Sequence, residues 1–330
     1  MNSLEVVNSM RGSPAPFGKL SPRTVVVGAD GFLGGALSTA LNAQRIVYGA
    51  CRDGDVPISQ AQEVLINAEV VINAGGFRVT PGFTMADYRR THEGAAAAIV
   101  PCLRNGATLL HISSASVLGK SRNTALGNNS SPDPSTFPSP EYAVAKLAAD
   151  RFLEKAAAER GFKVIFLRPA TVYGPQGTGM LGTFVRLAKR GIALHLYPQG
   201  ARHHLVHMDL VVEAARRVIE QNERLMHLTA LIVADPYTVT NYELEQIISR
   251  YASPGKMRVP IALPLLATIL RHSIRSRHPK LDLHTWGEIL GVLNLDTVYD
   301  PSETFDLIGI DPTNYTLERT LLPVIRKLLQ

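Results

Sequence analysis

The sequence contains little cysteine and no long hydrophobic run. Cys51 and Cys102 are its two cysteines, and no CxxC pair or cluster of metal-ligating partners accompanies either. Neither a disulfide framework nor a zinc site is therefore predicted, and a reducing, cytoplasmic location is expected. No segment approaches the roughly twenty consecutive apolar residues that a membrane-spanning helix requires, so no membrane partner is expected.

Long runs of one charge and a secretory signal are also missing. The 34 basic and 28 acidic residues give a net charge of +6, which is spread along the chain. This mild excess suits anionic small molecules, and because aromatic and basic residues are not interleaved, no nucleic-acid partner is expected. Residues 1–22 lack the apolar stretch of a secretory signal and are expected to form a disordered leader.

From Arg23 onward, strand-like and helix-like segments alternate. Apolar and β-branched runs predict strands at 24–27, 46–51, 70–76, 108–116 and 163–169, and helical spacing predicts helices at 32–43, 59–68, 86–106 and 140–160. Such alternation predicts an α/β fold, a doubly wound parallel sheet of the Rossmann type with helices on both faces.

The second half is less regular. Helices are predicted at 181–191 and 208–222, a buried strand at 231–235, and mostly helical structure from 238 to 330. We therefore expect a dinucleotide-binding domain and a smaller, mostly helical C-terminal substrate-binding lobe. The domain covers 23–177, with 208–235 returning to it, and the lobe is formed by 178–207 and 236–330.

The first predicted strand leads directly into a glycine motif, GADGFLG at 28–34. In a strand-turn-helix context the first glycine permits a tight turn, the second lets backbone approach a pyrophosphate, and the third lets the helix pack against the strand. The alternative is that the glycines only punctuate a turn. We predict that this motif binds a dinucleotide through Gly28, Asp30, Gly31, Phe32, Leu33 and Gly34.

The ends of the other strands bear on the same cofactor. An acidic residue after the second strand suits the free ribose 2′-hydroxyl of NAD, and an arginine suits the 2′-phosphate of NADP. Arg52 and Asp53 follow that strand, which favours NADP with NAD possible; a solvated charge pair on a loop is the alternative. Ligands of open parallel sheets bind at these carboxyl ends, so further cofactor contacts are expected from Asn73, Ala74, Gly75, Arg168 and Pro169.

The helix predicted at 140–160 carries a tyrosine and a lysine one turn apart. Tyr142 and Lys146 are at positions i and i+4, so the phenol and the ammonium lie on one face. A free tyrosine titrates near pH 10, too high for a proton shuttle at neutral pH, and a nearby ammonium favours the phenolate. Taken alone, the spacing also fits a chance surface pair.

Six motifs occur in a fixed order: GADGFLG, INAGG, HISSASVLG, YAVAK, LRPATVYGP and LVHMDL, across about residues 24 to 212. In this order they resemble the extended short-chain dehydrogenase/reductase family, the NAD-dependent epimerase/dehydratase group. The resemblance implies that Tyr142 is the general acid/base and that Ser114 hydrogen-bonds the substrate carbonyl or hydroxyl. It also implies that Lys146 binds the nicotinamide ribose and lowers the pKa of the phenol.

Two departures from the family pattern limit the mechanism and the reaction that the resemblance implies. Thr91 stands where the family usually has an asparagine, which argues against an asparagine-organised water relay. Ser114-Ala115-Ser116 stands where sugar dehydratases typically carry Thr-Asp-Glu, so dehydration is disfavoured.

The resemblance implies a nucleotide-activated sugar as substrate. Relatives usually bind the diphosphate with an arginine four residues before the histidine that corresponds to His207. In this chain that position is His203, and Arg202 is adjacent. Arg78, after the INAGG turn, is another candidate phosphate contact; the alternative is that it is a solvated loop arginine. His203 and His207 also have a metal-ligand spacing on a helix, but no third ligand accompanies them and no metal site is predicted. The expected substrate contacts are Arg78, Ser114, Ala115, Thr171, Arg202 and His203.

We therefore expect an NADP- or NAD-dependent oxidoreductase that reduces a carbonyl at C4 of a nucleotide-activated sugar, or epimerises through it. The sequence does not separate reductase from epimerase. One alternative is a reductase or dehydrogenase of a non-nucleotide ketone or alcohol, steroid-like or phenolic. A second is a non-catalytic dinucleotide-sensing regulator, against which the intact Ser114, Tyr142 and Lys146 argue. The resemblance also implies a homodimer formed through a helix bundle that includes the Tyr142 helix.

Overall fold

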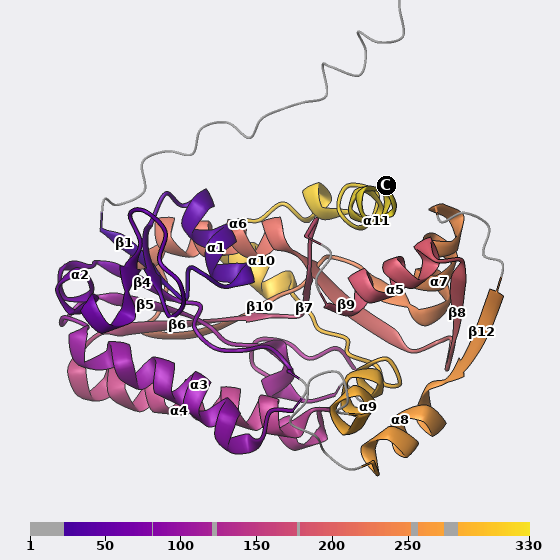
Figure 1. Ribbon diagram of the computed structural model, residues 1–330. Coiled ribbons are helices and arrows are strands. Elements are labelled where there is room, and N and C mark those ends of the chain that lie inside the picture. The colour runs from indigo at the N-terminus through magenta and orange to yellow at the C-terminus, as the bar shows by residue number, and fades with distance from the viewer. Residues whose placement is uncertain (1–22, 81, 121–123, 177–178, 252–256, 274–282) are drawn as a thin grey trace, which may run out of the picture.

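A seven-stranded sheet forms the centre of the computed structural model, which describes residues 23–80, 82–120, 124–176, 179–251, 257–273 and 283–330 (Figure 1). The strand order is β10-β6-β5-β4-β1-β2-β3, and every neighbouring pair is parallel. The direction of winding reverses between β1 and β4, which confirms the predicted doubly wound α/β fold. The strands are β1 (Thr24–Val27), β2 (Gln44–Val47), β3 (Val56–Pro57), β4 (Val70–Asn73), β5 (Thr108–Ile112), β6 (Lys163–Pro169) and β10 (Leu228–Val233).

Helices cover both faces of this sheet. Alternate residues of a strand point to opposite faces, so Val26 packs in the buried cluster with Leu37 and Leu210, whereas Val25 packs in the other with Leu153. Burial on both sides explains why β1 reads as an uninterrupted apolar run rather than an alternating one. One face carries α1 (Phe32–Ala40), α6 (Met208–Glu220) and α10 (Ser302–Ile308), and the other carries α2 (Gln62–Asn67), α3 (Met85–Ile99) and α4 (Pro140–Arg160).

The ends of α3 and α4 follow from local chemistry. A capping box between Thr84 and Asp87 starts α3, and α4 begins with Pro140 and ends at Gly161, which has a φ of +73°. The predicted helix 86–106 is wrong at its C-terminal end, because α3 stops at Ile99 and a 3-10 turn containing Pro101 follows. Proline lacks the N–H that an α-helix interior needs.

The remaining elements pack around a third buried cluster, and we call this part the second lobe; the cluster includes Tyr173, Phe184, Leu196, Leu244 and Val324. It holds more strand than predicted, in the small sheets β11-β9-β7 and β12-β8. The strands are β7 (Thr171–Tyr173), β8 (Ile192–Tyr197), β9 (Arg202–His207), β11 (Thr238–Thr240) and β12 (Met257–Ala262). The helices are α5 (Gly179–Lys189), α7 (Asn241–Tyr251), α8 (Leu263–Arg271), α9 (Leu283–Val292) and α11 (Leu321–Leu329).

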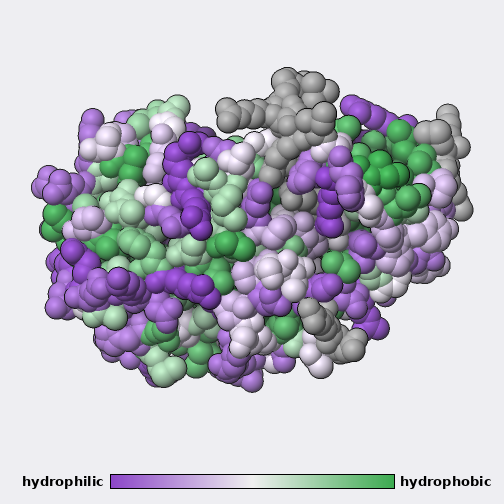
Figure 2. Space-filling view, turned by 90° about the horizontal axis from the view of Figure 1, so that it is seen from below, coloured by the Kyte–Doolittle hydropathy of each residue, from purple (hydrophilic) through white to green (hydrophobic). Residues whose placement is uncertain are grey.

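Apolar side chains are exposed on the second lobe. Figure 2 views the molecule from below and shows a hydrophobic area on the side where the second lobe lies. Leu265 and Ile269 of α8 are 63% and 57% exposed, and Trp286 of α9 is 37% exposed. Within the described ranges, no helix is both long enough and apolar enough to cross a membrane.

Candidate active site

The glycine motif forms the predicted turn between β1 and α1. Gly28 has a φ of +80°, and a Cβ there would lie 2.9 Å from backbone atoms of Ala74 and Gly75. A Cβ on Gly34 would lie 2.1 Å from the carbonyl oxygen of Gly28, so α1 packs directly on the turn. Gly31 precedes α1 and no side chain caps the helix. The first-turn N–H groups are thus available to an anion, and the segment fits the pyrophosphate of a dinucleotide.

The end of β2 differs from the prediction. The strand stops at Val47 rather than at residue 51, and the backbone N–H groups of Tyr48 and Gly49 donate to the Asp30 carboxylate at 3.4 and 2.9 Å. Arg52 lies farther along on an exposed turn, where its backbone N–H donates to Asp55. The charged group that lies against the end of β2 is therefore Asp30, not Arg52.

The turn after β4 lies against the glycine turn. Asn73 is fully buried, its side-chain oxygen accepts a hydrogen bond from Gly75 N at 3.0 Å, and Ala74 N donates to the carbonyl of Val27 at 3.0 Å. The structure thus brings the predicted cofactor residues after β1 and β4 into contact. Arg78 follows on the same loop and is exposed.

Tyr142 and Lys146 lie one turn apart on α4, as predicted. Tyr142 is half-buried, and the rings of Tyr88 and His92 meet its ring edge-on with centroids 5.7 and 5.5 Å away. Its phenol lies close enough to the Ser114 side chain for Ser114 to favour the phenolate. The Lys146 ammonium is buried and donates to the Ile112 carbonyl at 3.0 Å, at the carboxyl end of β5. The three residues that the family resemblance singles out are therefore adjacent in space.

Burial shifts the titration of this pair. It raises the pKa of Tyr142 to about 12, with Ser114 acting in the opposite direction and Asp150 adding to the rise. This shift is opposite to the expected lowering of the phenol's pKa by Lys146. Burial lowers the pKa of Lys146 to about 8, against the effect of the Asp150 carboxylate. At neutral pH the pair is a neutral phenol beside a protonated ammonium.

A buried polar cluster that the sequence analysis missed lies beneath the pair. Asp150, one turn after Lys146, accepts hydrogen bonds from Ser113 Oγ at 2.8 Å and from the Arg168 guanidinium at 3.3 Å, and His111 Nε2 is 3.8 Å away. Asp150 and Arg168 are only 3% and 8% exposed, so Arg168, predicted as a cofactor contact, has its side chain engaged in the interior. The spacing of Tyr142, Lys146 and Asp150 on one helical face was the signal available in the sequence.

The predicted substrate contacts are not all placed alike. Thr171 and Arg202 are exposed, whereas Ala115 is buried and 1% exposed. His203 is enclosed, with Nε2 2.9 Å from Asn241 Oδ1 and Nδ1 3.4 Å from Thr297 Oγ1. The side chain of His203 is therefore held inside the second lobe. Of these two neighbouring residues, Arg202 is the one whose charged side chain is exposed to a ligand.

The three histidines of the HHLVH segment lie on strand β9, not on a helix. His204 Nδ1 accepts from Tyr299 N at 2.8 Å, and His207 caps α6 by accepting from Asp209 N at 3.2 Å. Within the described ranges, no group of three metal-ligating side chains occurs.

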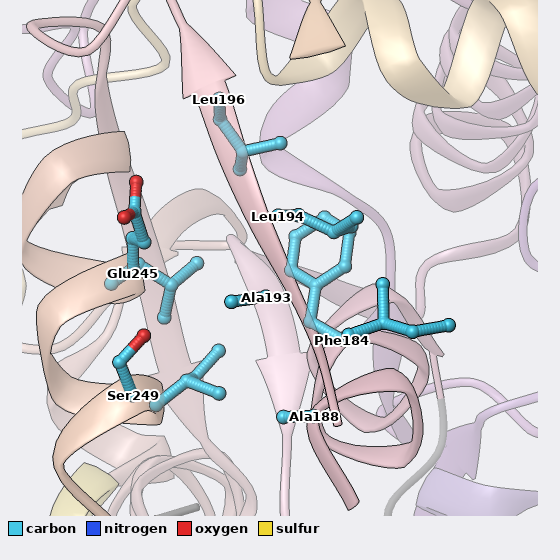
Figure 3. Close-up of a pocket in the computed structure, with 10 residues that line it drawn as sticks. Phe184, Ala188, Ala193, Leu194, Leu196, Glu245 and Ser249 are labelled. Atoms are coloured by element: carbon cyan, nitrogen blue, oxygen red, sulfur yellow. The ribbon is translucent and has the colours of Figure 1, made fainter. Parts of the chain in front are cut away.

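A pocket in the second lobe is separate from these residues. It lies between α5, β8 and α7, and Phe184, Leu194, Leu196 and Glu245 are among the residues that line it (Figure 3). Glu245 pairs with His195 at 2.7 Å. None of the predicted site residues lines this pocket, so it belongs to the packing of the lobe.

Comparison with known proteins identifies a sequence family. The model of the NAD dependent epimerase/dehydratase family matches residues 24–234. No match is found among curated proteins.

Solved structures share the whole fold at low sequence identity. MoeE5 in complex with UDP-glucuronic acid and NAD is 20% identical, with 92% of this chain and 98% of that chain covered and a TM-score of 0.69. The UDP-glucuronic acid 4-epimerase from Bacillus cereus, in complex with UDP-glucuronic acid and NAD, is 14% identical over 92% and 98% with a TM-score of 0.70. RMD from Pseudomonas aeruginosa, complexed with NADPH, is 16% identical over 93% and 98% with a TM-score of 0.68.

Proposed function

The chain belongs to the NAD dependent epimerase/dehydratase family, and we propose that it is a nicotinamide-dependent oxidoreductase acting at C4 of a nucleotide-activated sugar. It would reduce a keto group at that carbon or epimerise through it. The observation that carries the proposal is the grouping of Ser114, Tyr142 and Lys146 at the carboxyl end of β5, on the same edge of the parallel sheet as the glycine turn after β1. A bound nicotinamide would supply or accept the hydride.

The protein's own part is proton transfer and orientation. The neutral phenol of Tyr142 is in the state needed to donate a proton to a carbonyl oxygen as that oxygen gains charge. Ser114 Oγ accepts hydrogen bonds from Ser116 N at 3.2 Å and Ser116 Oγ at 2.9 Å, so its own proton is the one it can donate, and a bound carbonyl oxygen next to Tyr142 would receive it. The protonated Lys146 favours the phenolate that results.

The proposed substrate class rests on two kinds of support. Similar structures were solved with UDP-glucuronic acid or UDP-glucose bound, which is a property of those proteins. In this chain, Arg78 on the loop after β4 and Arg202 at the start of β9 are both exposed. Guanidinium groups suit the oxygens of a diphosphate.

The preferred dinucleotide is proposed from charge. The Asp30 carboxylate at the end of β2 suits a ribose with a free 2′-hydroxyl and repels a 2′-phosphate, so we favour NAD. The alternative is NADP, which was predicted from Arg52. The relative affinities for NADH and NADPH decide between the two.

The first test is to purify the protein, denature a sample and identify any released nicotinamide nucleotide by chromatography. The emptied protein is then titrated with NADH and NADPH and assayed with UDP-sugars and their 4-keto forms. Retained NAD with interconversion of C4 epimers would support an epimerase, and an empty site with consumption of reduced cofactor would support a reductase. A protein that binds neither dinucleotide would refute the proposal.

A second candidate substrate class is favoured by the loop after β4. Phe77 is 54% exposed beside Arg78, and aromatic contacts run from Phe77 through Phe83 to Tyr88 beside Tyr142. An exposed aromatic ring there suits an apolar, ring-containing ketone. Turnover of such a ketone without competition by UDP would support this class over nucleotide sugars.

A further inference from the structure

The buried carboxylate of Asp150, one turn beyond Lys146 on α4, joins three elements. It lies on α4, accepts from Ser113 Oγ at the end of β5 at 2.8 Å and pairs with Arg168 of β6 at 3.3 Å. Ser113 N also donates to the Leu167 carbonyl at 2.7 Å. The turn that carries Ser114 is therefore fixed on one side by β6 and on the other by the Asp150 side chain.

Asp150 also determines the charges around Lys146. Lys146 is 6% exposed, and its ammonium donates a hydrogen bond to a neutral carbonyl, Ile112 O, at 3.0 Å. Asp150 follows one helical turn later, and its negative charge stabilises the ammonium against burial. Tyr142, on the same helix, is neutral at this pH because burial raises its pKa to about 12. His92 from α3 and His111 from β5 also interact with Lys146, and burial keeps both neutral by lowering the pKa of each imidazole.

We propose that Asp150 is a positioning residue, which ties the Ser113–Ser114 turn to α4 and keeps the Lys146 ammonium charged next to Tyr142. It touches no reacting group itself and acts through Ser113 and Lys146. This inference rests on the proposed function, because Lys146 has a role only where a nicotinamide ribose binds.

The electrostatic part predicts a shift in the pH dependence of cofactor binding. Lys146, with a pKa near 8, should lose its charge as pH rises from 7 to 9, and affinity for NADH should fall with it. Asp150, with its pKa raised by burial to about 6, is ionised throughout this window. An opposite charge within about 4–6 Å shifts a pKa by about one to three units, and side chains four residues apart on a helix are neighbours at about 5–6 Å between their Cβ atoms. Because Arg168 shares the carboxylate, we expect about one unit, which is a tenfold change in proton affinity.

The experiment is a titration of the full chain with NADH by fluorescence between pH 6 and 9.5. Asp150→Asn should move the midpoint of the affinity loss down by about one pH unit, which weakens binding about fivefold at pH 8 and about tenfold at pH 9. Lys146→Met should remove the pH-dependent loss altogether. The matched control is Glu154→Gln, which removes an exposed negative charge one turn farther along α4 and should leave the midpoint unchanged.

Each result decides between the hypotheses. A wild-type midpoint in Asp150→Asn would overturn the inference, as would a pH-dependent loss that persists in Lys146→Met. If Asp150→Asn does not fold, Ser113→Ala keeps the charge but removes one of its hydrogen bonds, and it should move the midpoint in the same direction by less; no movement would overturn the inference. Absence of dinucleotide binding by the wild-type chain at every pH would instead overturn the proposed function.

Discussion

Replacing Gly34 with alanine should destabilise the fold and weaken dinucleotide binding. A Cβ at this position would lie 2.1 Å from the carbonyl oxygen and 2.8 Å from the carbonyl carbon of Gly28. Since Cβ atoms stay at least 3.0 Å from such atoms, α1 must move off the Gly28 turn by about 0.9 Å. The same movement displaces the N–H groups at the start of α1 that are proposed to meet the pyrophosphate.

The size of the effect follows from the cost of overpacking. Forcing a methyl group into a closed contact costs about 1–3 kcal/mol. With an unfolding entropy of about 2.1 cal/mol/K per residue, this corresponds to a fall in Tm of about 1.5–4 °C for a chain of this length. Loss of about 1.4 kcal/mol of binding free energy at the displaced helix end would weaken NADH binding about tenfold.

Gly94→Ala is the matched control, because it makes the same chemical change within α3. A Cβ there would meet no atom within 4 Å. Alanine is favoured over glycine in a helix interior by about 1 kcal/mol, so Tm should rise slightly and NADH affinity should not change. Thermal unfolding followed by circular dichroism and NADH titration measure both. Wild-type Tm and affinity in Gly34→Ala would refute the close contact between α1 and the turn.

Three further predictions concern other parts of the chain. Tyr142→Phe should abolish turnover while dinucleotide affinity stays nearly unchanged, and substantial turnover by this variant would refute the acid/base role. Burial lowers the pKa of His203 to about 4, so stability present above pH 6.5 is lost as pH falls toward 4, where only the unfolded chain takes up this proton. His203→Gln should therefore make the unfolding free energy less dependent on pH in that window, by up to about 1.4 kcal/mol per pH unit; an identical slope in chemical denaturation would contradict a neutral buried imidazole. Thr84→Ala should cost about 1 kcal/mol by removing the cap that accepts from Asp87 N, and an unchanged denaturation midpoint would count against that cap.

The central sheet could be predicted because its signals are local. Each parallel strand is a short apolar run. Each following helix has its own hydrophobic periodicity and its own start and stop residues, such as Pro140 and Gly161 for α4. The order of motifs then placed Tyr142, Lys146 and Ser114 at one sheet edge, and the structure brings these three together.

The errors concern segments whose structure depends on distant partners. Strand β9 was not predicted, because its conformation is set by pairing with β7 and β11, which the sequence does not reveal. The end of β2 depends on Asp30, which is far from it in sequence. Asp150 was overlooked because a carboxylate on a helix is usually solvated, and only packing of α4 on β5 and β6 shows that it is buried.

The single tryptophan of the chain gives the two halves of the molecule different optical signals. Trp286 lies on α9 in the second lobe, where it is partly exposed. Indole emission excited near 295 nm therefore reports on that lobe, whereas the parallel sheet and its helices contribute to far-ultraviolet ellipticity without a tryptophan of their own. If the two signals change at the same denaturant concentration, the lobe and the sheet unfold as one cooperative unit. If emission changes first, the second lobe opens while the sheet that carries Tyr142 is still folded.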